Sequence, residues 1–194
     1  MKLNEIANIS TGYSFRSKIK HDSEGDTKVI QMSDVDKYRG IIPEGLQSIS
    51  GFEPRKDRYF LEGGDVIMIS KGYNINAFVV PPGLGRVVAV NSFIVLKPDK
   101  YKLLPEYLAW FLNSNRTQHF FKAVSAGTNI PNLSIRALKG LDINPPSIER
   151  QEKLAELDRL KRREIALHQE IASKKEKLVD TMLQQQADKW KSNN

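Results

Sequence analysis

The chain has 194 residues, of which 40% are hydrophobic and 27% charged, and it contains no cysteine. Such a composition is typical of a globular protein, and it excludes disulfide bonds and cysteine-ligated zinc. No apolar run is long enough to span a bilayer, and the first residues lack the apolar core of a signal peptide, so we expect a cytoplasmic protein with no membrane partner. The formal net charge of +7 favours a polyanionic partner, because neutralising phosphates releases counterions.

The first part of the chain alternates short apolar runs with turns. Runs rich in β-branched and aromatic residues and bounded by glycine or proline predict strands. These runs occupy residues 28–32, 59–61, 66–69, 77–80 and 93–96. Asp65 follows two glycines, so we interpret it as a turn residue rather than a metal ligand.

Two helices are expected after the last of these strands. The first starts at Pro105, a residue suited to the first turn, and the second runs from about Asn115 to Val124. Strands and helices do not alternate regularly, which argues against a doubly wound sheet. We therefore predict a mixed α/β domain over residues 1–146.

The composition changes after Pro145-Pro146. Ser147 is suited to cap a helix and Glu149 to face its N-terminal dipole, and no glycine or proline follows until the end of the chain. A helix over residues 147–186 is predicted, roughly 60 Å long, followed by a polar tail over residues 187–194. A helix of that length needs a partner surface.

The apolar residues of this helix have the spacing of heptad a and d positions. Two parallel copies would stack Glu164 on Glu164 and Lys174 on Lys174, whereas antiparallel copies centred near Gln169 pair Glu164 with Lys174 in a register where a faces d throughout. The sequence therefore predicts an antiparallel coiled coil, most simply a homodimer; packing on the chain's own domain or on another protein are the alternatives. The proposed interface residues are Leu157, Leu160, Glu164, Leu167, Ile171, Lys174 and Leu178.

Motifs for catalysis are not found. The segment Asn144-Pro145-Pro146 lacks the following aromatic residue that amino-methyltransferases use to stack a flipped base, and a rigid linker is the simpler interpretation. Gly83-Leu84-Gly85 is interpreted as a turn, and the three histidines show no ligand spacing. We therefore expect no catalytic residue, no bound metal and no cofactor.

Three predicted loops mix glycine, small polar, aromatic and basic residues: residues 11–18, 70–76 and 125–129. Backbone amides, hydroxyls and cations suit phosphate contacts, and Arg, Asn and Lys can read base edges in the major groove. Solvated turns have the same composition, so this alternative stays open.

The chain resembles the DNA specificity subunit of type I restriction–modification systems, with one target-recognition domain and one spacer helix. The resemblance spans nearly the whole chain, up to about Leu183, and rests on the order and spacing of several motifs. These are LNEIANISTGYSF at residues 3–15, GDVIMIS at 64–70, SAGTNIPNLS at 125–134 and INPPSIERQ at 143–151.

The usual member of that family carries two such domains and two such helices, so this chain is similar to a half-size form. The resemblance implies a non-catalytic subunit that binds double-stranded DNA and docks a methyltransferase subunit, with or without a restriction subunit, so that an adenine in each half-site is methylated. A homodimer would read a bipartite palindrome, with the helix pair fixing the gap between half-sites. The base-reading candidates are Tyr13, Arg16, Lys71, Tyr73, Asn74, Thr128 and Asn129, and the phosphate-contact candidates are Lys18 and Arg116.

Other interpretations remain open. The long helix could serve a structural or assembly protein in which the basic domain is incidental. A methyltransferase remnant would be revealed by cofactor binding, and a truncated full-length subunit is a further alternative. The polar residues after Leu183 are typical of a fraying end, which argues against truncation.

Overall fold

The structure is a computed structural model that describes residues 1–54, 57–72, 74–125 and 132–192, without the side chains of residues 190–192. Two short 3₁₀ helices, η1 (Leu3–Glu5) and η4 (Asp57–Tyr59), contribute to the packing of the domain. The strands are β1 (Ala7–Thr11), β2 (Thr27–Ile30), β3 (Val35–Asp36), β4 (Gly40–Ile41), β5 (Gln47–Ile49), β6 (Val66–Ile69), β7 (Ala77–Val79), β8 (Val87–Ala89) and β9 (Phe93–Pro98). The helices are α1 (Pro105–Asn113), α2 (Asn115–Val124), α3 (Ile135–Lys139) and α4 (Ile148–Ser192).

The centre of the domain is an antiparallel sheet with the strand order β1-β9-β6-β7. In β6 the side chains of Val66 and Met68 contribute to one apolar cluster, and those of Ile67 and Ile69 to another on the opposite face. All four of these side chains are buried. A strand that is covered on both faces needs an unbroken apolar run, which is the pattern seen at residues 66–69.

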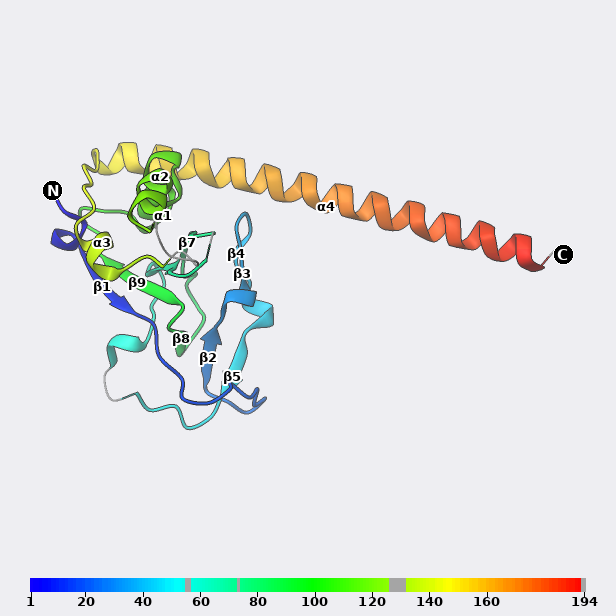
Figure 1. The fold of residues 1–194 in the computed structure, drawn as a ribbon, viewed down its shortest axis with the longest axis horizontal. Coiled ribbons are helices and arrows are strands. Elements are labelled where there is room, and N and C mark those ends of the chain that lie inside the picture. Colours follow the sequence, from blue (N-terminus) through cyan, green and yellow to red (C-terminus); the bar gives the residue numbers. More distant parts are fainter. Residues whose placement is uncertain (55–56, 73, 126–131, 193–194) are drawn as a thin grey trace.

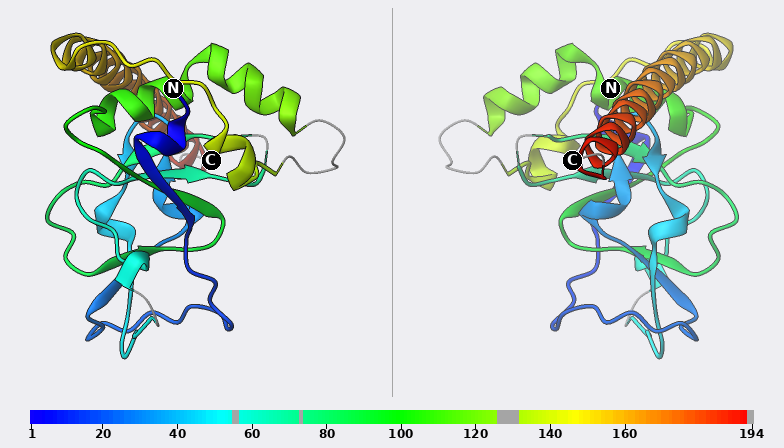
Figure 2. Two further views of the ribbon diagram at one scale, coloured as in Figure 1. Left: turned by 90° about the vertical axis from the view of Figure 1, so that its left-hand side faces the viewer. Right: turned by 90° about the vertical axis from the view of Figure 1, so that its right-hand side faces the viewer.

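Two layers cover this sheet (Figure 2). On one face lie α1, α2, α3 and η1, with Leu108, Leu112 and Phe121 fully or almost fully buried there. On the other face lies the sheet with the order β5-β2-β8, in which β2 pairs antiparallel with β5 and parallel with β8. This mixture of strand directions and the long terminal helix confirm the predicted mixed α/β fold.

A smaller cluster packs on the outer side of that second sheet. The rings of Tyr13, Phe15 and Phe52 lie 4.8–5.5 Å from one another, and Tyr59 lies 5.1 Å from Tyr13. This explains why the strand predicted at residues 59–61 was wrong. Asp57–Tyr59 is a 3₁₀ turn, and Phe60 forms only an isolated bridge with Val88. The rings of Tyr59 and Phe60 pack on the aromatic cluster instead of forming a regular strand.

The long helix α4 begins against the domain and is fixed there by one amide side chain. Gln151 is fully buried. Its Nε2 donates to the carbonyls of Lys102 (3.0 Å) and Pro146 (2.9 Å), and its Oε1 accepts from the backbone N–H of Leu104 (2.9 Å). Gln151 therefore joins the start of α1 to the start of α4, and the two helices pack together from there.

Beyond the domain α4 has no neighbour within the described part of the chain (Figure 1). Every described side chain from Ile171 onward is exposed. The helix continues to Ser192, past the end predicted near Gln186, because nothing in the polar tail breaks a helix. No helix in the ranges that the structure describes is both long and apolar enough to cross a bilayer.

The heptad residues lie on the side of α4 that faces away from the domain. Gln151, Ala155 and Ala166 are buried, whereas the apolar heptad side chains are 41–64% exposed. At about 100° per residue, the two sets lie on roughly opposite sides of the helix. Packing of the heptad stripe on the chain's own domain, one of the alternatives left by the sequence, is therefore wrong.

Substituting Gln151 tests whether this side chain holds α4 in place. The Gln151→Ala variant leaves the Leu104 N–H and the Lys102 and Pro146 carbonyls without this partner, so we expect the free energy of unfolding to fall by about 1–3 kcal/mol. Urea unfolding monitored by tryptophan fluorescence measures the change. The matched control Gln169→Ala, at an exposed position of the same helix, should change it by less than about 0.5 kcal/mol. Equal effects in the two variants would contradict the assignment.

Candidate nucleic-acid interface

The first of the predicted loops is held against the turn between β8 and β9. Gly12 N–H donates to Phe93 O (2.9 Å), and Tyr13 N–H donates to Ala89 O (2.8 Å). The Asn91 amide donates to Ser14 Oγ (3.1 Å). A Cβ atom on Gly12 would lie 2.2 Å from Val90 O, so only glycine allows this close approach.

The second loop leaves the buried strand β6 and meets the segment before α3. Ser70 donates from both its N–H and its Oγ to Ser92 O, at 2.8 Å each. Leu133 N–H donates to Ser70 O (2.8 Å), and Lys71 forms an antiparallel bridge with Asn132. The end of β6 is thus tied to both neighbouring segments.

Helices α1 and α2 support the rest of this loop. The Asn113 side chain accepts from Ala77 N–H and donates to Ala77 O, both at 2.8 Å. The Gln118 amide donates to Ile75 O (2.8 Å). These contacts fix the backbone that follows Asn74, whose side chain is exposed.

These segments surround a pocket of about 390 Å³. Residues from five separate parts of the sequence line it, among them Thr11, Tyr59, Lys71, Asn91 and Asn132. Lys71 supplies a positive charge, and no carboxylate side chain is among the lining residues that the structure describes. The pocket therefore offers hydroxyls, amides and a cation to a ligand that is negatively charged or rich in hydrogen-bonding edges.

A second pocket of about 340 Å³ adjoins the first and shares Lys71. Lys37, Asn74 and Asn76 line it together with Asp36. The two pockets make a continuous polar surface that runs from Asn132 past Lys71 to the β3–β4 hairpin. We call this surface the loop surface.

The structure brings some of the predicted site residues to the loop surface and leaves others away from it. Lys71 and Asn74 line it. The ring of Tyr13 instead packs half-buried in the aromatic cluster, and Lys18 lines a separate pocket with Phe15 and Phe52. Tyr73, Thr128 and Asn129 lie outside the described residues.

The exposed cations of the prediction are available for a ligand. Arg16, Lys18, Lys71 and Arg116 are exposed, and none of them forms an ion pair with a carboxylate of the described residues. Arg116 stands in the first turn of α2. Their roles as base or phosphate contacts remain predictions.

Sequence reasoning missed Asn91, Asn132 and Ser134, which also line the first pocket. Asn91-Ser92 lies between two apolar runs, a signal for a turn, but nothing in the sequence places that turn beside Thr11. Ser134 accepts from Ala137 N–H (3.1 Å) and caps α3, so Asn132, two residues earlier, lies just outside a helix end.

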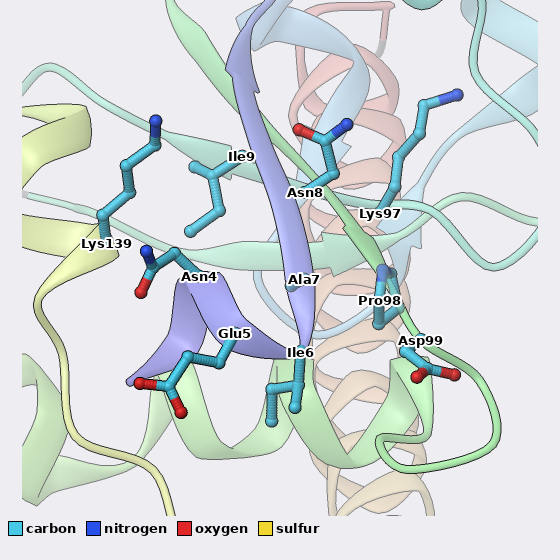
Figure 3. A pocket seen from close by; sticks show the side chains of 10 residues that line it. All are labelled: Asn4, Glu5, Ile6, Ala7, Asn8, Ile9, Lys97, Pro98, Asp99 and Lys139. Atoms are coloured by element: carbon cyan, nitrogen blue, oxygen red, sulfur yellow. The ribbon is translucent and has the colours of Figure 1, made fainter. Parts of the chain in front are cut away.

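Another pocket, of about 490 Å³, lies along β1 and includes none of the predicted site residues (Figure 3). Its cations Lys97 and Lys139 are accompanied by the carboxylates of Glu5 and Asp99. Lys97 is also engaged elsewhere, at 3.2 Å from the buried carboxylate of Asp65 and 2.9 Å from Phe60 O. This balance of charges makes it a weaker anion site than the loop surface.

Asp65 has the structural role that the sequence analysis assigned to it. It is buried, and its carboxylate accepts from Glu62 N–H (2.9 Å) as well as contacting Lys97. In the ranges that the structure describes, no group of three or more His, Asp or Glu side chains is placed to hold a metal ion.

Comparison with known protein families matches residues 1–176 to the type I restriction modification DNA specificity domain. The chain belongs to this family. The match includes the mixed α/β domain, the loop surface and most of α4.

Related proteins place this DNA specificity domain in longer chains. The Type I restriction enzyme HindI specificity subunit of Haemophilus influenzae is 29% identical over a stretch that covers 40% of this chain and 20% of that protein. This chain therefore spans about a fifth of that curated relative.

Solved structures share the fold at low sequence identity. A chain from a study of the assembly and conformational transition of the type I R-M system has a TM-score of 0.64 at 21% identity, covering 87% of this chain and 43% of that one. The HsdS subunit from Thermoanaerobacter tengcongensis gives 0.56 at 16% identity, covering 86% and 38%. The S subunit from M. genitalium gives 0.51 at 17% identity, covering 81% and 37%.

A methyl group at residue 12 tests the packing that forms the first pocket. Gly12→Ala forces the loop away from Val90 O, and we expect the free energy of unfolding to fall by about 1–3 kcal/mol. Gly45→Ala is the control, because nothing lies within 4 Å of its added Cβ, and it should stay within about 1 kcal/mol of the parent chain. Urea unfolding of both variants decides, and a neutral Gly12→Ala would show that the loop is not held as described.

Proposed function

We propose that the chain is a non-catalytic specificity subunit, which binds double-stranded DNA through the loop surface and directs a methyltransferase subunit to its target. The observation that carries this proposal is the convergence of four distant segments around Lys71 in a pocket without a carboxylate. Membership of the DNA specificity domain family supports it. The proposed base readers on the loop surface are Lys71 and Asn74.

The geometry of the loop surface suits base reading. Bidentate amides and cations distinguish base pairs in the major groove, and discrimination requires that they be held by ordered backbone. Asn74 directly precedes the segment that Asn113 and Gln118 support, and Lys71 is held by its bridge to Asn132. Exposed Lys18 and Arg116 would add phosphate contacts that set the register of the domain on the duplex, and exposed Arg16 remains a proposed base reader.

The exposed heptad stripe supports a homodimer. One copy of α4 leaves the five apolar side chains of the heptad stripe exposed, opposite the face that packs on the domain. An antiparallel partner centred near Gln169 would cover them and place Glu164 against Lys174. The partner helix would lie on the side of α4 opposite Gln151 and Ala155, which pack on the domain.

Such a homodimer would read a bipartite palindrome. A two-fold axis through the helix pair relates the two domains, so identical half-sites would be read in inverted orientation with a gap between them. The stretch of α4 between each domain and the axis would set the length of that gap. Bond breaking is left to the partner enzyme in this proposal.

Selection from a random duplex library tests this function. The chain, together with a type I methyltransferase subunit, should enrich a two-part palindrome with a fixed gap. An asymmetric single site would retain DNA recognition and reject the homodimer. Failure of an intact complex to enrich any sequence would favour an assembly protein that uses α4 alone.

Within the same selection, Asn74→Ala should relax the preference at one position of each half-site, by about 1–3 kcal/mol against the wrong base. Asn8→Ala is a matched control, because Asn8 is exposed on β1 away from the loop surface. An enriched sequence that is the same for both variants and the parent chain would remove Asn74 from the site.

Charge exchange in the heptad stripe tests the antiparallel register. Glu164→Lys places Lys against Lys174 of the partner subunit and should weaken self-association, and the added Lys174→Glu should restore it, with a coupling of about 0.5–3 kcal/mol. Sedimentation of the single and double variants measures the effect. Since Lys174 also contacts Glu170 within its own helix (2.8 Å), Lys174→Glu alone is the control for that loss. If the double variant self-associates no more tightly than the summed effects of the two single variants predict, the register is rejected.

A further inference from the structure

A groove of about 430 Å³ lies between the β3–β4 hairpin and α4, separate from the loop surface. Four arginines line it, Arg39 from the hairpin and Arg159, Arg162 and Arg163 from α4, together with Tyr38 and Glu170. We call it the arginine groove. The hairpin rises from the domain toward the helix in Figure 1.

The hairpin tip is built to hold Arg39 in a fixed position. The Asp36 carboxylate accepts from the backbone N–H groups of Tyr38 and Arg39, at 2.8 Å each. Gly40 has a φ of +85°, which closes the turn in a conformation that L side chains rarely adopt. The arginine therefore projects from an ordered turn.

Two of the four arginines are already paired within α4. Arg159 contacts both oxygens of Glu156 at 2.6 Å, and Arg162 lies 2.9 Å from Asp158. These pairs reduce the local charge, but they also hold the two guanidinium groups along the floor of the groove. The net positive charge must then come from the other two arginines.

Arg39 and Arg163 are left without a close carboxylate. Glu170 lies 2.8 Å from Lys174 and only at 4.0 Å from Arg39. The hydrogen bond from Lys174, with its charge and those of Arg39 and Arg163, holds the pKa of Glu170 below its usual value. Arg163 forms no ion pair with any carboxylate in the part of the chain that the structure describes.

We propose that the arginine groove binds the phosphodiester backbone of duplex DNA without regard to sequence, an inference that rests on the proposed DNA-binding function. Two guanidinium groups on opposite walls match the oxygens of a phosphate, with which arginine forms bidentate hydrogen bonds. The groove stands between the recognition domain and the free half of α4. DNA that leaves a half-site toward the dimer axis would pass this position.

The proposed homodimer would bring two such grooves to one face. Its two-fold axis is perpendicular to the plane that contains the two helices. The rotation therefore keeps the arginine grooves of both copies on the same side of that plane. Arg163 of one copy and its symmetry equivalent would lie about 18 Å apart along the helices. The DNA held there is the gap between half-sites, whose sequence is not read but whose phosphates are always present.

Removing single charges from the groove tests the proposal. The chain in its methyltransferase complex is titrated with a duplex that carries the selected sequence and with one whose half-sites are scrambled, at several KCl concentrations. Arg39→Gln and Arg163→Gln should each weaken binding to both duplexes by the same factor. The slope of log K against log salt should become shallower by about 1 for each phosphate contact removed.

Arg150→Gln is the matched control, since Arg150 is an exposed arginine of α4 outside the groove, and it should leave the slope unchanged. Circular dichroism and the melting midpoint show that each variant is folded. Groove variants that match Arg150→Gln would overturn the proposal. So would variants that lose the methyltransferase while keeping the salt slope, because the groove would then bind an acidic protein surface. If the parent complex binds the two duplexes equally, only the proposed sequence recognition is refuted. The salt dependence of binding would still report whether the arginine groove contacts phosphates.

Discussion

The buried amide of Gln151 determines how the two parts of this protein are joined. A glutamine side chain in an apolar environment must satisfy its polar atoms, and here it does so with backbone groups from the segment after β9, the start of α1 and the segment before α4. Those partners lie where three elements meet, so the direction of α4 relative to the sheet follows from one set of hydrogen bonds. The heptad stripe then faces away from the domain because Gln151 and Ala155 face toward it.

The domain likewise combines buried strands, whose side chains are fixed by packing, with exposed polar residues at the strand ends. Strand β6 is buried on both faces, and so is β9 apart from the half-buried Lys97, so these strands form a rigid support rather than a ligand-binding surface. Ser70 and Lys71 follow β6 immediately, and Asn91 and Ser92 precede β9, which places the polar residues at one end of the rigid sheet. The residues proposed to recognise DNA can thus differ in chemistry while the strands that carry them stay the same.

Local sequence patterns predicted the elements with strong periodicity, and they failed where contacts are distant. Residues 66–69 and 115–124 form a strand and a helix as predicted, since their apolar spacing and flanking breakers depend on neighbours alone. The short strands β3, β4, β5 and β8 were not recognised, because two or three residues carry too little pattern. The bridge between Lys71 and Asn132 and the position of Arg39 beside α4 depend on the path of the whole chain, which no local pattern encodes.

The first residues are fastened to the segment that leads into α4. Met1 exchanges backbone hydrogen bonds with Ile143, and Lys2 contacts Asp142 at 2.8 Å, which holds the pKa of that carboxyl below its usual value. In the proposed antiparallel pair, the far end of one α4 comes level with this region of the partner. A short peptide would therefore suffice to connect two copies in tandem. Once covalently joined, the two domains could diverge independently, and a symmetric pair would become a single chain whose two halves read different sequences.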